Sequence, residues 1–165
     1  MSGIVLSQIL GTLAAICLIP SLYSGTLQDL KEFMFSEKHF ESPWINLAYI
    51  LVILMYLFLL IEGSLTFAAE LILISVIATL VFSFIGFRFS SGGDWRALMY
   101  VAWIAPFMLA YVLLATGICG VVQAVYWMMK PGDTDTPVMF RKIPFALSIL
   151  CGYIIALAIS LPFPA

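Results

Sequence analysis

Long runs of uncharged, mostly apolar residues alternate with short polar segments along this chain. Residues 3–22, 42–61, 71–87 and 97–129 contain no charged side chain, and another such run begins at residue 143. About 20 apolar residues, at about 1.5 Å each, cross the hydrocarbon core of a bilayer as a helix. The pattern predicts an all-α, polytopic integral membrane helix bundle in one domain, residues 1–165, with five transmembrane helices at about 3–22, 44–62, 65–87, 96–129 and 143–161.

A short helix in the plane of the interface is also predicted, at about residues 27–36. Thr26 and Asp29 have the spacing of a capping box, and the apolar residues that follow share one helix face. Pro20 is expected to kink or end the first transmembrane helix before this segment. Pro106 is expected to kink the fourth apolar run, which as one straight helix would overshoot the bilayer.

Composition supports a membrane location and excludes some partners. Of the 165 residues, 64% are hydrophobic and 10% are charged, which is outside the range of soluble domains. The net charge of -2 and the scattered basic residues argue against nucleic acid as a partner. We therefore expect an integral protein of a bacterial cytoplasmic membrane or an organelle inner membrane, with lipids, other membrane subunits or further copies of itself as partners.

Glu70 is the most costly residue to place, because it falls within the third apolar helix. Counting residues inward from the hairpin at Gly63 puts side chains of other helices at a similar depth. This predicts a polar layer that could serve as an ion or proton site. Its candidate members are Glu70, Glu62, Gln123, Tyr56, Gln8 and Ser148.

Small residues recur at helical spacing on four of the predicted helices, which is typical of close helix packing in membranes. The first and last helices carry them at four-residue intervals. The packing candidates are Gly3, Ser7, Gly11, Ala15, Ser75, Thr79, Ser83, Gly117, Gly120, Ser148, Gly152, Ala156 and Ser160.

The remaining chemistry is sparse. Arg88 and Arg96 flank a run of serine and glycine that could hold a lipid headgroup. Glu37, His39 and Glu41 alternate, which makes them weak candidates for metal ligands, although a solvated loop is the simpler explanation. We predict no catalytic residues, no metal site and no cofactor, and we leave room for a bound lipid. An enzyme is less expected than a protein without catalysis.

Five crossings would put the loop at Asp133 on the same side as the N-terminus and the Gly63 hairpin. Lysine and arginine would then be divided between Lys130, Arg141 and Lys142 on that side and Lys31, Lys38, Arg88 and Arg96 on the other. Because the two sides carry nearly equal numbers of basic residues, the positive-inside rule predicts no orientation.

The leading functional hypothesis is a small integral subunit that packs within or stabilises a larger membrane complex or a homo-oligomer, because the small-residue faces exceed what five helices need. One alternative is a small transporter or channel with a protonatable Glu70. Another is a lipid-binding protein or an intramembrane enzyme.

Overall fold

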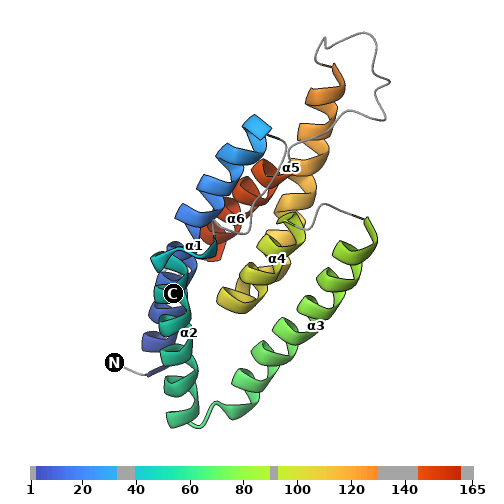
Figure 1. Ribbon diagram of the computed structural model, residues 1–165. Coiled ribbons are helices and arrows are strands. Elements are labelled where there is room, and N and C mark those ends of the chain that lie inside the picture. The colour runs from blue at the N-terminus through green and yellow to red at the C-terminus, as the bar shows by residue number, and fades with distance from the viewer. Residues whose placement is uncertain (1–2, 33–39, 90–92, 130–144, 161–165) are drawn as a thin grey trace.

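The computed structural model describes residues 3–32, 40–89, 93–129 and 145–160, which are helical apart from short turns. Figure 1 shows the helices as a tilted bundle. The elements are α1 (Gly3–Glu32), α2 (Pro43–Ile61), α3 (Leu65–Phe89), α4 (Gly93–Ile104), the 3-10 helix η2 (Pro106–Met108), α5 (Leu109–Met129) and α6 (Ala146–Ser160).

Four segments are long and apolar enough to cross a membrane: Val5–Lys31, Pro43–Ile61, Leu65–Ile85 and Pro106–Met129. The shorter α6 is also apolar. Large apolar side chains cover the outer faces of these helices; on α3, Leu80 is 67% exposed and Phe84 is 64% exposed. Such a continuous apolar surface suits contact with hydrocarbon rather than water.

The first helix is longer than expected. α1 continues through Pro20 to Glu32, so the prediction that a separate interfacial helix starts near residue 27 is wrong. Pro20 removes one backbone hydrogen bond, but contacts with α6 hold the chain on both sides of it. The Tyr153 hydroxyl donates to the Ala15 carbonyl before Pro20, and the Ala146 N–H donates to Asp29 Oδ2 after it.

The fourth apolar run is two helices, not the single kinked helix predicted at 96–129. α4 ends at Ile104, η2 follows, and the chain then turns back into α5. Pro106 lies at this break, as the sequence indicated, but the backbone reverses there instead of bending. On α3, Ser75 Oγ donates to the carbonyl of Ala102, which is one of the acceptors left open where α4 ends.

The direction of each helix follows from its contacts. α4 runs antiparallel to α3, since Trp95 stacks with Phe82 and Trp103 donates to Thr79. α6 runs antiparallel to α1, because Ala146 bonds Asp29 and Tyr153 bonds Ala15.

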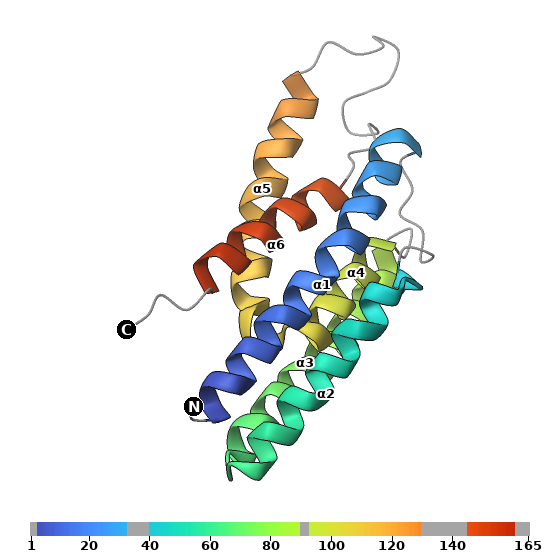
Figure 2. The same ribbon diagram turned by 90° about the vertical axis from the view of Figure 1, so that its left-hand side faces the viewer.

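α5 runs antiparallel to α6, since Gln123 accepts from Ser148 and Gly152 lies against Thr116. α5 therefore runs back toward the end of the bundle at which α4 begins (Figures 1 and 2).

All the long connections consequently join helix ends at one end of the bundle, which we call the loop end. The opposite end, the hairpin end, holds the start of α1 and the turn at Gly63, whose φ of 75° suits glycine. Asp133 itself lies outside the described residues, but the helix ends that flank it, Met129 and Ala146, are at the loop end and not on the side of the Gly63 hairpin as expected, because the reversal at Pro106 adds one change of direction.

The small-residue faces of α1 and α6 pack inside the bundle. Ala15, Ala156 and Ser148 are each no more than 1% exposed. A Cβ on Gly152 would lie 2.5 Å from the backbone nitrogen of Thr116, so α5 and α6 meet at backbone distance there. Gly117, by contrast, faces open space. The side chain of Gly3 lies outside the described part.

Candidate functional site

A cavity lies at the hairpin end, where the bundle has fewer helices. α4 and α5 reverse at η2 and do not continue to this end, so α1, α2, α3 and the last turn of α6 are left around an unfilled space. Its volume is about 530 Å³, within the range of pockets that hold small organic ligands.

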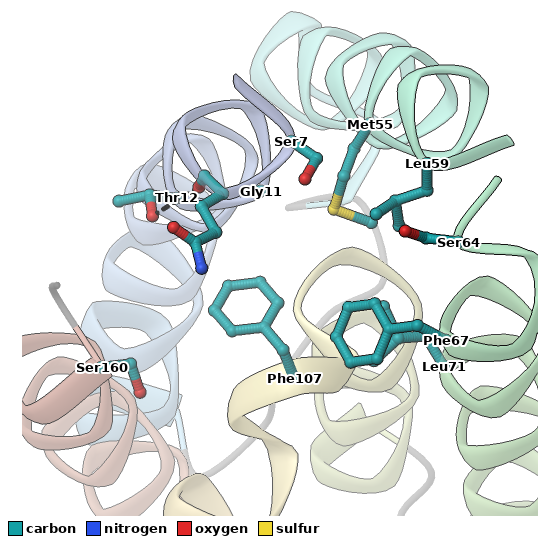
Figure 3. Close-up of a pocket in the computed structure, with 11 residues that line it drawn as sticks. Ser7, Gly11, Thr12, Met55, Leu59, Ser64, Phe67, Leu71, Phe107 and Ser160 are labelled. Carbon is teal, nitrogen blue, oxygen red and sulfur yellow. Dashed lines mark hydrogen bonds between the residues drawn. The ribbon is translucent and has the colours of Figure 1, made fainter. Parts of the chain in front are cut away.

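Two kinds of side chain line this cavity (Figure 3). Hydroxyl and amide groups come mainly from α1, and the apolar groups come from α2, α3 and η2. Ser7 and Met55 point into the space from one side, and Phe107 and Phe67 face them from the other. The lining residues are Ser7, Gln8, Gly11, Thr12, Met55, Leu59, Ser64, Phe67, Leu71, Phe107 and Ser160.

Individual positions set the shape and polarity of the cavity. A Cβ on Gly11 would lie 3.0 Å from the sulfur of Met55 and 3.2 Å from the ring of Phe107, so glycine leaves room at this wall. Thr12 Oγ1 donates to the Gln8 carbonyl at 2.9 Å, as threonine often does in a helix. The Ser160 hydroxyl is buried and has no hydrogen-bond partner among the described residues.

The residues predicted to form one polar layer are not gathered in one place. Gln8 lines the cavity, but Gln123 and Ser148 hydrogen-bond each other near the loop end. Glu70 is exposed on α3 and Glu62 is exposed after α2. The break at Pro106 explains the difference, because the predicted depths assumed that residues 96–129 crossed in one direction.

A second polar cluster lies near the loop end, between α1, α4 and α6. Asp29 is 5% exposed, and its carboxylate accepts a hydrogen bond of 3.1 Å from Ala146 at the N-terminus of α6, where the helix dipole favours negative charge. Thr26 also contacts Ala146, through the carbonyl, at 3.2 Å.

Asp94 belongs to the same cluster and starts α4. Burial, and secondarily the negative charge of Asp29, raise the pKa of the Asp94 carboxyl to about 6. One of its carboxyl oxygens is buried and lacks a partner among the described residues. This cluster ties the start of α6 to α1.

The other candidate residues from the sequence are either exposed or lie outside the described part. Arg96 is exposed on α4, and the side chain of Arg88 lies outside the described part. Glu37 and His39 also fall outside the described residues, whereas Glu41 is exposed. In residues 3–32, 40–89, 93–129 and 145–160, no group of three histidine, cysteine or acidic side chains could hold a metal ion.

Sequence reasoning missed the cavity as a site, although it identified some of its residues as packing positions. The four-residue spacing of Ser7, Gly11 and Ser160 predicts helix contact and does not by itself indicate a cavity. One signal in the sequence pointed to the cavity: Pro106 interrupts an apolar run that is too long for one membrane crossing. A helix that stops part-way through the bundle leaves space beyond its end.

The fold and the cavity define the class: a small polytopic membrane protein, all-α, with four candidate spans and a ligand-sized cavity at one end. No family model matches the chain, and no curated protein or solved structure shows significant similarity to it.

Proposed function

We propose that this membrane protein binds a lipid-like molecule in the cavity at the hairpin end. The observation that carries the proposal is the division of the cavity wall into a polar side on α1 and an apolar side on α2, α3 and η2. A ligand with a polar group and a hydrocarbon part would match both sides, and its polar group could pair with the Ser160 hydroxyl, which is buried without a hydrogen-bond partner among the described residues.

The cavity also has a depth that suits such a ligand. Ser64 lies in the turn between α2 and α3, and Leu71 lies about 10 Å further along at the helical rise. The site thus extends from the membrane surface region into the hydrocarbon region. A molecule already in the bilayer has its polar and apolar parts in this order.

Lipid binding has more support than the two other hypotheses from the sequence. The subunit hypothesis rested on surplus small-residue faces, but those of α1 and α6 are used within the chain. The transport hypothesis rested on a buried Glu70 in a polar layer, and Glu70 is exposed on α3.

Filling the cavity tests the proposal. Gly11→Leu places a branched side chain against Met55 and Phe107, whereas Gly117→Leu adds the same atoms on an exposed part of α5 where nothing lies within 4 Å. Both variants are purified in nanodiscs of total membrane lipid, and bound lipid is measured by native mass spectrometry after detergent washing. We expect Gly11→Leu to lose bound lipid and Gly117→Leu to retain it.

A second variant distinguishes loss of lipid binding from loss of folding in Gly11→Leu. Thr12→Leu changes a half-buried cavity residue on the same wall, and its helix content is compared with that of the parent by circular dichroism. Equal lipid retention by both cavity variants and the parent would refute the proposal. Absence of lipid from the parent, together with no labelling of cavity peptides by a photoactivatable lipid, would refute it as well.

A further inference from the structure

Among the described residues, the cavity wall contains hydrogen-bonding groups but no charged side chain. The polar residues of this lining are three serines, one threonine and one glutamine, without a lysine, arginine, aspartate or glutamate. An ionic headgroup inside this space would lose hydration without meeting an opposite charge, which is costly. Hydroxyl and amide groups instead match a ligand group that donates or accepts hydrogen bonds while neutral.

The surroundings of the cavity disfavour an anion in particular. In the part of the chain that the structure describes, the charged side chains near the hairpin end are those of Glu62 and Glu70, and both are acidic and exposed. Lys31, Arg88 and Arg96 lie toward the loop end, and the other basic residues belong to the segments that connect helix ends there. No basic side chain of the described part is therefore placed to neutralise a phosphate or carboxylate at the cavity.

The same distribution orients the cavity in the membrane. With the reversal at Pro106, Lys31, Arg88 and Arg96 lie on helices near the loop end, and the other four basic residues occur in the sequence between helix ends of that same side. Basic residues in short loops favour the cytoplasmic side. The loop end thus corresponds to the cytoplasmic side, and the cavity lies toward the opposite leaflet.

Two lining residues supply the groups that would contact a neutral polar head. The buried Ser160 hydroxyl has no hydrogen-bond partner in the described part, so a polar group of a ligand could form the hydrogen bond that it lacks. Gln8 adds the one side-chain amide of the lining, and an amide can donate and accept at the same time.

We infer that the cavity selects an uncharged amphiphile carrying hydroxyl or carbonyl groups, taken from the non-cytoplasmic leaflet and held by Gln8 and Ser160. This inference rests on the proposed function and adds the chemical class of the ligand and the residues that recognise it. The hydrocarbon part lies against Phe67, Leu71 and Phe107.

Three photoactivatable probes with one common hydrocarbon chain test the inference: a monoacylglycerol, an alkyl sulfate and an alkyl trimethylammonium. Each is added at equal density to the full chain in phosphatidylcholine vesicles, and labelled peptides are quantified by mass spectrometry. We expect the monoacylglycerol to label peptides that line the cavity at least about tenfold more than either charged probe, because charge burial is costly.

Variants then assign the recognition. Gln8→Leu and Ser160→Ala should each reduce monoacylglycerol labelling about three- to tenfold, the effect of one lost hydrogen bond. Thr66→Ala, on an exposed position of α3 outside the lining, is the matched control and should leave labelling unchanged.

The outcomes separate the two proposals. Equal labelling of the cavity by neutral and anionic probes, or unchanged labelling in both recognition variants, would overturn the inference while lipid binding stands. Absence of cavity labelling by every probe would overturn the proposed function itself.

Discussion

Replacing Gly152 tests how closely α5 and α6 approach each other. A Cβ at this position would overlap the hydroxyl oxygen of Thr116, and it would lie 2.5 Å from the backbone nitrogen and 2.7 Å from the Cα of that residue. Two of these atoms belong to the backbone, so no side-chain rotation removes the clash. Restoring ordinary contact in Gly152→Ala requires the two helices to separate locally by about 1 Å.

The expected cost follows from overpacking a close helix interface. Inserting a methyl group into a well-packed site destabilises by about 1–3 kcal/mol, which changes the folding equilibrium by about 5- to 150-fold. Separation would also weaken the hydrogen bond between Ser148 and Gln123, one turn away along α6. A cost toward the upper part of this range is therefore expected.

The assay is reversible unfolding in mixed detergent micelles of rising dodecyl sulfate content, followed by tryptophan fluorescence. The matched control is Gly117→Ala on α5, where an added Cβ meets nothing within 4 Å and should be neutral or slightly stabilising. If Gly152→Ala were as stable as the parent or as Gly117→Ala, the close approach of α5 and α6 described above would be refuted.

Three further predictions concern the end of α4, the topology and the pH response. Ser75→Ala should lower the free energy of unfolding by about 1–2 kcal/mol, because it leaves a carbonyl in the last turn of α4 unpaired. The same detergent titration measures this change, and an unchanged stability would contradict the prediction. The topology is tested with two single-cysteine variants in a cysteine-free background and a membrane-impermeant maleimide. Met129→Cys should react in inside-out vesicles, and Glu62→Cys should react in right-side-out vesicles. Reaction of both variants from the same side would refute the reversal at Pro106. The raised pKa of Asp94 means that the folded state binds a proton more tightly than the unfolded state, so stability should fall as the pH rises from about 4 to 6, by up to about 3 kcal/mol. Thermal unfolding at both pH values checks this, and Asp94→Asn should remove that part of the response.

The recognition residues could be only partly anticipated from sequence. Gln8 was recognised as a polar residue at membrane depth, and it does line the cavity. Glu70 was expected to be the centre of the site, yet it is exposed on α3. Periodicity gives the angle of a residue around its own helix, but not which neighbouring helix, if any, covers that angle.

Hydrophobic pattern by itself determined that the chain is all-α and apolar enough for a membrane, because charge-free runs of this length have few alternatives in lipid. It also located the interruption at Pro106, where a missing N–H disfavours continuation of a helix. Only the tertiary structure decided that the chain reverses there, because a kinked helix and a reversal have the same local sequence pattern. The contacts that distinguish them are between distant segments: α3 packs against α4, and α6 packs against α5. That reversal sets which helix ends share a side, and it leaves the space beneath η2 that becomes the cavity.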